Sequence, residues 1–183
     1  CFPAAFFDRD GTLVADRGYL DTEEGIELLP GAARALRQLK KAGLLLFLVT
    51  NQSGIGRGFF GPEVVNAQHR RLARLLDEAE GITLDDVRVC PHAPEAGCTC
   101  RKPAPGMLFA LAAVHRVSLT ASFMVGDKQS DMEAGKAAGC RTVGIGANIQ
   151  VADRLVTDAG SAASAILDML SHSEANASNR KAV

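Results

Sequence analysis

The sequence predicts a doubly wound α/β protein, in which helices cover both faces of a mostly parallel sheet. The first observation is a set of five short apolar runs that lack polar alternation, as expected for strands buried on both faces. The second is that segments with helical spacing separate these runs. Alternating strands and helices connect parallel strands through right-handed crossovers, so the strands are expected to share one sheet.

The expected strands are short and rich in β-branched or large apolar residues. They cover residues 4–7, 44–50, 87–90, 122–126 and 141–146. The longest apolar run, GLLLFLV, is far shorter than the roughly 18–20 residues that a membrane span requires. It therefore fits a central strand of the sheet.

The expected helices lie between and after these strands. They cover residues 31–42, 62–80, 106–116, 128–138 and 161–170. The first ends at Gly43 and the fourth at Gly139, because glycine readily takes the left-handed conformation that closes many helices. The second begins at Pro62, which suits the first turn of a helix.

Length and composition favour one globular domain of ordinary type. The chain has 183 residues, 47% of them hydrophobic, and a net charge of −1. We expect a single domain over residues 1–170 and a polar, disordered tail over 171–183. The near-neutral charge gives no general attraction to nucleic acid or to an anionic membrane.

The first residues and the cysteines bear on cellular location. No secretory segment opens the chain, and Cys1 in place of methionine suggests that the natural N-terminus has been trimmed. Three of the five cysteines are clustered, unlike the evenly spread cysteines of a secreted disulfide framework. We therefore expect a cytoplasmic protein.

Polar residues with chemical potential follow three of the expected strands. Asp8 and Asp10 follow the first strand, TNQSGIGRG continues the second, and GDKQSD ends the fourth. In open α/β sheets ligands bind at the carboxyl ends of the strands, so these segments are expected to converge. Asp8 and Asp10 are two residues apart, which puts both carboxylates on one side of extended backbone.

This set of residue types suits phosphoryl transfer with Mg²⁺. A few carboxylates with room for water and phosphate oxygens are the ligands that magnesium prefers. One carboxylate is then the nucleophile, and a second is the general acid and base. Thr50, Lys128 and the Arg101–Lys102 pair are expected to stabilise charge on the transferring phosphate.

The segments FFDRDGTLV, VTNQSGIGRG, RKP and VGDKQSD, in this order, resemble the four motifs of the haloacid dehalogenase superfamily of aspartate-dependent phosphatases. The resemblance covers about residues 4–146 and implies a Rossmann-like sheet. It implies that Asp8 is the nucleophile and Asp10 the general acid and base. The Mg²⁺ ligands would be Asp8, Asp127 and the backbone carbonyl of Asp10.

The resemblance also assigns the residues around the phosphate. Thr50 and Lys102 would bind the transferring phosphoryl group, with help from Asn51 and Arg101. For Asp131 two roles stay open: orienting the water ligands of the metal, or capping a helix. Members of the superfamily often insert a cap domain, but each spacer here holds about one helix–strand unit. We therefore expect a capless enzyme with an open site.

Cys90, His92, Cys98 and Cys100 form the pattern C-x-H-x5-C-x-C, one Cys₃His ligand set for Zn²⁺. Four protein ligands leave no open position, so the zinc is expected to be structural. Arg101 and Lys102 follow directly, and metal binding would hold their loop in place where local packing cannot. The alternatives are reduced thiols near a turn, or a disulfide.

The zinc loop and the RKP motif resemble one branch of the superfamily, whose members act on a heptose 1,7-bisphosphate or on histidinol phosphate. The segment ADRGYL favours the heptose bisphosphate, and the resemblance implies that it contributes substrate-binding residues. The expected substrate-binding set is Asp16, Arg17, Gly18, Tyr19, Asn51, Gln52, Ser53, Arg57 and Lys128. Arg17 and Arg57 are either ligands of the second phosphate or solvated surface residues.

Three alternatives to a heptose phosphatase remain. They are a histidinol-phosphate phosphatase, a polynucleotide 3′-phosphatase and a zinc-stapled binding module without catalysis. One tyrosine, no tryptophan and a slightly acidic balance disfavour a nucleic-acid substrate. The presence of all the expected catalytic acids and of Lys102 disfavours a silent module. We thus expect a monomer that acts on a small phosphorylated sugar, with no nucleic-acid or membrane partner.

Overall fold

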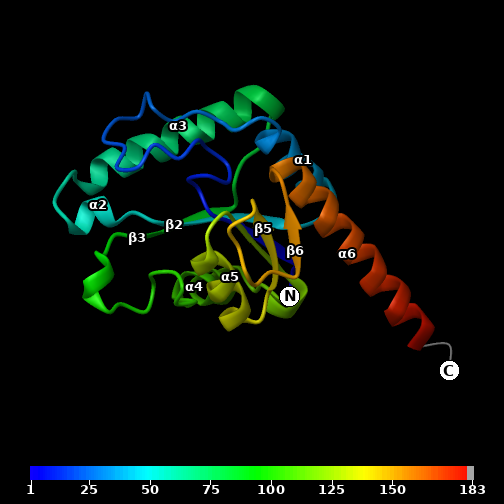
Figure 1. Ribbon diagram of the computed structural model, residues 1–183. Coiled ribbons are helices and arrows are strands. Elements are labelled where there is room, and N and C mark those ends of the chain that lie inside the picture. Colours follow the sequence, from blue (N-terminus) through cyan, green and yellow to red (C-terminus); the bar gives the residue numbers. More distant parts are fainter. Residues whose placement is uncertain (181–183) are drawn as a thin grey trace.

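The computed structural model describes the backbone of residues 1–180 and the side chains of residues 1–172 (Figure 1). Six strands form one parallel sheet in the order β3-β2-β1-β4-β5-β6. The strands are β1 (Ala4–Phe7), β2 (Leu45–Asn51), β3 (Asp86–Cys90), β4 (Phe123–Gly126), β5 (Arg141–Ile145) and β6 (Arg154–Val156). The predicted doubly wound α/β fold is confirmed.

Helices cover both faces of this sheet. They are α1 (Ala32–Lys41), α2 (Ser53–Gly56), α3 (Pro62–Glu80), α4 (Gly106–His115), α5 (Gln129–Ala138) and α6 (Ala159–Arg180). Two short 3₁₀ turns, η1 (Pro94–Ala96) and η2 (Leu119–Ala121), complete the elements. In Figure 1 the helices α1, α3 and α6 lie on one side of the sheet, and α4 and α5 lie on the other.

Two buried clusters hold these layers together. Phe7 of β1 packs in a cluster with residues of α1, α3 and α6, including Leu36, Leu72 and Ile166. Its neighbour Phe6 packs in the second cluster, with Leu108 of α4. Successive residues of a strand point to opposite faces, so β1 contributes to both cores.

The sheet order determines where the site lies. β1 pairs with β2 on one side and with β4 on the other, in a register that brings Phe7 opposite both Leu48 and Val125. The carboxyl ends of all three strands therefore meet at one edge. The chain runs from β1 outward to β2 and β3 and then crosses back to β4 on the other side of β1. The strand order reverses here, and open α/β sheets bind ligands at such a point.

The predicted strands and helices are present, with bounds that differ by one or two residues at most ends. The prediction missed β6, an exposed three-residue edge strand, and the short helix α2. The last helix is longer than expected: the proposed tail, residues 171–183, belongs to α6 as far as Arg180. Residues 181–183 lie outside the described part of the chain.

The segments between the strands are too short to contain a cap domain, as expected. Within residues 1–180 the segment from β1 to α1 carries only isolated bridges, and the segment from β2 to β3 contains α2 and α3. No further domain is inserted in that range. None of the helices in this part of the chain is long and apolar enough to cross a membrane.

Candidate active site

Asp8 and Lys102 form the floor of the site. The Nζ of Lys102 lies 2.7 Å from Oδ1 of Asp8 and donates to the backbone carbonyl of Val49 at 2.8 Å. A third partner is Oδ1 of Asp131, at 2.7 Å. Both Lys102 and Asp8 are buried. A buried ammonium group with three oxygen partners is fully paired, so the loop after the zinc-ligand segment delivers its cation to the expected nucleophile.

Asp127 completes a group of three carboxylates at the ends of β1 and β4. One oxygen each from Asp8, Asp127 and Asp131 lie within 4.8 Å of one another, close enough to share a metal ion. Oδ1 of Asp127 is buried and has no hydrogen-bond partner among the described residues. Buried carboxylate oxygens are rarely left unpaired, so this oxygen is available to bind a metal ion.

The electrostatics of the site follow from burial and from the nearby charges. Burial raises the pKa of Asp127 to about 7, and the charges of Asp8 and Asp131 add to this effect, while Lys128 opposes it. Burial by itself would lower the pKa of Lys102, but Asp8 and Asp131 hold it above its ordinary value. The carboxylate cluster is thus poised to accept a divalent cation.

Asp131 has two roles in the structure: it caps α5 and it forms an ion pair with Lys102. Its Oδ2 accepts a hydrogen bond from the backbone N–H of Lys128 at 3.0 Å, which caps α5. The capping role is therefore confirmed, and the orientation of metal-bound water stays a prediction. The chain also approaches closely here: a Cβ at Gly126 would lie 2.2 Å from Oδ2 of Asp131. Glycine at the end of β4 makes room for the carboxylate.

Gly11 makes similar room for Asp127. Its φ of 80° lies in the left-handed region, and a Cβ there would lie 2.2 Å from Oδ2 of Asp127. Only glycine satisfies both the backbone conformation and the space. The DRDGT segment thus needs its glycine in order to bring the first and fourth motifs together.

Asp10 lies beside the floor and is held by two side chains. The Nε of Arg9 lies 3.1 Å from each of its carboxylate oxygens. Nε2 of Gln52 donates to Oδ2 of Asp10 at 2.8 Å and is also 2.8 Å from Oγ1 of Thr50. These contacts connect the expected acid and base to the end of β2.

Asn51 connects β2 to the segment that carries Lys102. Its Nδ2 donates to the carbonyl of Lys102 at 3.0 Å, and its Oδ1 accepts the Lys102 N–H at 3.1 Å. This reciprocal pair positions the Lys102 backbone. Arg101 donates to the carbonyl of His92 at 3.3 Å and contributes to the wall of the pocket.

An open pocket of about 480 Å³ reaches Lys102, whereas Asp8, Thr50 and Asp127 are not among its lining residues. Its lining includes the expected residues Asp10, Asp16, Gly18, Tyr19, Asn51, Gln52, Ser53, Arg101, Lys102 and Lys128, together with Gly54, Pro103 and Ser130. Asp16 accepts from Lys128 at 3.2 Å, and this contact ties the ADRGYL segment to the start of α5. The segments that follow β1, β2, β3 and β4, which include the ADRGYL segment and the loop with the zinc ligands, therefore form one site.

Arg17 and Arg57 lie outside the lining of this pocket and form exposed ion pairs. Arg17 pairs with Glu27 at 2.6 Å, and Arg57 pairs with Glu95 at 3.5 Å. Exposed pairs of this kind contribute little to stability, so either arginine is free to exchange its partner for an anion. Their role toward a second phosphate stays a prediction.

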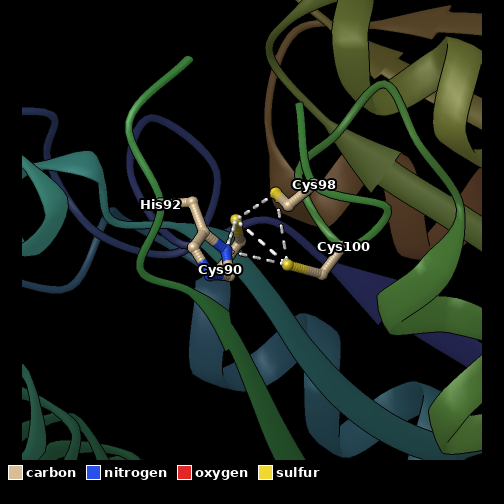
Figure 2. A group of neighbouring side chains, drawn as sticks. All are labelled: Cys90, His92, Cys98 and Cys100. Atoms are coloured by element: carbon tan, nitrogen blue, oxygen red, sulfur yellow. Dashed lines mark hydrogen bonds between the residues drawn. The ribbon is translucent and has the colours of Figure 1, made fainter. Parts of the chain in front are cut away.

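The predicted zinc ligands lie together in the structure (Figure 2). The contacts among Cys90, His92, Cys98 and Cys100 range from 3.3 to 3.6 Å. Tetrahedral zinc with bonds of about 2.3 Å to sulfur would separate its ligand atoms by roughly 3.7 Å. These contacts lie within about 0.4 Å of that separation, so the four side chains could hold a zinc ion after a small expansion.

The zinc loop also contacts the loop after β2. The backbone N–H of Gln52 donates to the carbonyl of Cys90 at 2.8 Å, and that of Gly56 donates to Pro91 at 2.8 Å. A Cβ on Gly56 would lie 2.6 Å from the nitrogen of Ala93. The zinc loop thus supports two parts of the site, the Gln52 segment and the Arg101–Lys102 pair.

Sequence reasoning missed three residues of the site region. Arg9 is buried beside Asp10, Gln68 of α3 contacts Arg9, and Phe59 packs edge-to-face on Tyr19 with ring centroids 4.7 Å apart. A signal for Gln68 existed, because it falls on the apolar stripe of α3 with Val65 and Leu72. Phe59 lay in a loop without periodicity, so no pattern pointed to it.

Comparisons with known proteins identify relatives of this chain. The family model of haloacid dehalogenase-like hydrolases matches residues 5–61, and that of HAD-hydrolase-like proteins matches residues 99–172. A D-glycero-beta-D-manno-heptose-1,7-bisphosphate 7-phosphatase of Rhodopseudomonas palustris is 47% identical over 146 residues, 75% of this chain and 79% of the relative. The protein of the same name from Photorhabdus laumondii is 39% identical, over 92% of this chain and 91% of its own.

A solved structure shows the same fold. The crystal structure of D,D-heptose 1,7-bisphosphate phosphatase from B. bronchiseptica, complexed with magnesium and phosphate, superimposes with a TM-score of 0.84. The two sequences are 31% identical, and the match covers 91% of this chain and 99% of the other. The similarity therefore extends over nearly the whole of both chains.

Proposed function

The chain belongs to the haloacid dehalogenase-like hydrolases, and on that premise we propose that it hydrolyses the C7 phosphate of D-glycero-β-D-manno-heptose 1,7-bisphosphate. The observation that carries the proposal is the 47% identity to a relative of that name, over 79% of the relative's length. The same name favours the β anomer at C1. The product would serve the synthesis of nucleotide-activated heptose.

The side chains on the floor supply the chemistry of a phosphoric monoester hydrolase. A carboxylate oxygen of Asp8 attacks phosphorus and forms a phosphoryl-aspartate. Asp10 protonates the leaving sugar oxygen, and its carboxylate then takes a proton from the attacking water. Lys102 and Thr50 stabilise the charge on the transferring group, and Lys102 must exchange one of its internal oxygen partners for a phosphate oxygen.

Haloacid dehalogenase phosphatases use Mg²⁺, and the residues present here fit it. Asp8 and Asp127 would hold the ion together with the backbone carbonyl of Asp10, and Oδ1 of Asp127 is a buried oxygen that lacks a partner. The related crystal structure from B. bronchiseptica contains magnesium and phosphate. When bound, the ion neutralises charge on the phosphate and the nucleophile.

The second metal in the proposal is a structural Zn²⁺ held by Cys90, His92, Cys98 and Cys100. The fit of these four ligand atoms to a tetrahedron supports it. None of the five cysteines in the described chain forms a disulfide, which favours action in a reducing compartment, the cytoplasm.

The substrate would enter the open pocket with its C7 phosphate on the floor. The sugar then lies among Asp16, Gly18 and Tyr19, and its hydroxyl groups meet polar side chains there. The C1 phosphate would reach the rim, where Arg17 and Arg57 can exchange their exposed carboxylate partners for an anion. The anomeric preference would depend on this rim.

The test compares kcat/KM for phosphate release from both anomers of heptose 1,7-bisphosphate and from histidinol phosphate, with Mg²⁺. We expect the β anomer to be preferred over histidinol phosphate by about 100-fold or more, which corresponds to roughly 2.7 kcal/mol. A preference for histidinol phosphate would overturn the substrate and leave the mechanism in place. No phosphate release from any of the three would overturn the enzyme assignment itself.

A further inference from the structure

Arg9, between the two aspartates of the DRD motif, is an unusual residue for its position. Its side chain is 1% exposed and is among the largest fully buried side chains of the described residues. The guanidinium pairs through Nε with both oxygens of Asp10, at 3.1 Å each. Burial of a charge is costly unless a partner compensates it. The partner that compensates the Arg9 charge is Asp10, the expected general acid and base.

Gln68 of α3 fixes Arg9 from the other side. Its Oε1 accepts from Nη1 of Arg9 at 2.8 Å, and the residue is fully buried. Its Nε2 donates to the carbonyls of Leu20 and Thr22, at 2.8 and 3.2 Å. Because two carbonyls occupy both protons of the amide, its oxygen must face Arg9. The amide therefore has one orientation, and so has the guanidinium that it holds.

The contacts form one chain, buried at Arg9 and Gln68, that runs from the substrate loop to the reaction centre. The chain of contacts begins at Leu20, the last residue of the ADRGYL segment, and at Thr22, two residues further on. It continues through Gln68 of α3 to Arg9, which follows β1. With Gln52 on the other side, the Asp10 carboxylate is held by donors from two directions. A carboxylate held in this way cannot rotate away from the leaving oxygen.

We propose that Arg9 and Gln68 are positioning residues for Asp10, which keep its carboxyl group aimed at the leaving sugar oxygen. The inference rests on the proposed phosphatase function. Neither residue needs to touch the substrate, since both act through Asp10. Their loss is expected to weaken general acid catalysis and to leave the attack by Asp8 intact.

Two substrates with different leaving groups distinguish a loss of general acid catalysis by Asp10 from a loss of attack by Asp8. A sugar alkoxide is a strong base and needs a proton as it departs, whereas 4-nitrophenolate is a weak base and departs without one. The parameter kcat/KM covers the steps up to release of this group and not the later attack by water. A positioning defect at Asp10 therefore lowers kcat/KM for the heptose bisphosphate and spares that for 4-nitrophenyl phosphate.

The experiment measures kcat/KM for both substrates in wild type, Gln68→Met and Arg9→Met. Gln68→Met keeps the size of the side chain and removes its hydrogen bonds. We expect it to lower kcat/KM about tenfold or more for heptose 1,7-bisphosphate, part of the 10²–10⁴-fold that general acid catalysis supplies, and less than about twofold for 4-nitrophenyl phosphate. Arg9→Met is expected to show the same selectivity with a larger loss.

Leu72→Ala is the matched control, because Leu72 is buried one turn further along α3 and its apolar side chain cannot form a hydrogen bond with Arg9. It is expected to lower thermal stability and to leave the ratio of the two kcat/KM values unchanged. Equal losses on both substrates in Gln68→Met would overturn the positioning role. If wild-type protein released phosphate from neither substrate, the proposed function would fail instead, and the inference with it.

Discussion

At the scale of single residues, Lys102 has the densest set of interactions in the site. Its ammonium group donates to Asp8 and to the Val49 carbonyl, and it forms an ion pair with Asp131. The positive charge of Lys102 balances the negative charges of two buried carboxylates. Its ammonium group also lies where a phosphate oxygen would bind in the proposed mechanism. Structure and chemistry therefore depend on the same buried charge.

Replacing Lys102 with methionine is expected to destabilise the protein by about 3–5 kcal/mol in buffer without added Mg²⁺, because it leaves buried carboxylates without their counter-charge. Urea unfolding of both proteins at neutral pH measures the difference. Lys40→Met is the control, since Lys40 pairs with Asp85 in a partly exposed position and should cost less than about 1 kcal/mol. A loss for Lys102→Met no larger than the control would contradict the compensating role.

Asp127 gives the metal site a predicted pH dependence. Its pKa is raised to about 7 by burial and by the nearby carboxylates, so below pH 7 the metal-free site holds it protonated. A protonated carboxyl is a poor ligand, and Mg²⁺ must displace its proton. Mg²⁺ affinity should therefore rise by up to about tenfold per pH unit between pH 6 and 7 and level off above.

Calorimetric titration with Mg²⁺ from pH 6 to 8 checks this expectation. Asp127→Asn removes the titrating group, and its weak residual binding should lose most of the pH dependence. An affinity for Mg²⁺ in wild-type protein that is the same at pH 6 and pH 8 would show that Asp127 is ionised throughout, against the account of its burial.

At the scale of elements, the zinc loop acts on the site through its two neighbours. It leads directly into Arg101 and Lys102, and it packs against the segment after β2 through the backbone of Gln52 and Gly56. The loop itself consists of short turns and the three-residue η1. Cys90 lies in the buried cluster with Leu108, and Cys98 and Cys100 pack against it. The proposed metal coordination would add order to the rest of the loop.

Cys98→Ser is expected to lose bound zinc and to lower kcat/KM by about 10²-fold, because displacing Lys102 by roughly an ångström is enough for such a loss. Elemental analysis for zinc and phosphate-release assays measure the two effects together. Cys1→Ser is the control, since Cys1 is exposed and outside the cluster, and it should change neither. Full activity in zinc-free Cys98→Ser would refute the positioning role of the loop.

At the scale of the whole molecule, the sequence predicted the layers, most elements and the convergence of three strand ends. The reason is that β1, β2 and β4 are buried on both faces, which leaves a clear apolar run before each functional segment. The edge strand β6 could not be found, because Arg154–Val156 is short and largely exposed. The Arg9–Gln68 contact joins residues 59 positions apart, which periodicity cannot reveal.

The monomeric state stays a prediction, and light scattering tests it: a monomer of this chain has a mass near 19.2 kDa. Phe109 and Val114 on the outer face of α4 are exposed, and their exposure should not produce a dimer at micromolar concentration. A stable dimer that dissociates in Phe109→Ser would contradict this expectation.

The proposed mechanism places a covalent phosphoryl group on Asp8, and the variant Asp10→Asn tests this step. With 4-nitrophenyl phosphate the first step needs no acid, whereas the second still needs the Asp10 base. The account predicts a burst of 4-nitrophenol equal to the enzyme concentration, and a phosphoryl group on the peptide with Asp8 after acid quench and mass spectrometry. Turnover with no burst, or a phosphoryl group on another residue, would contradict it.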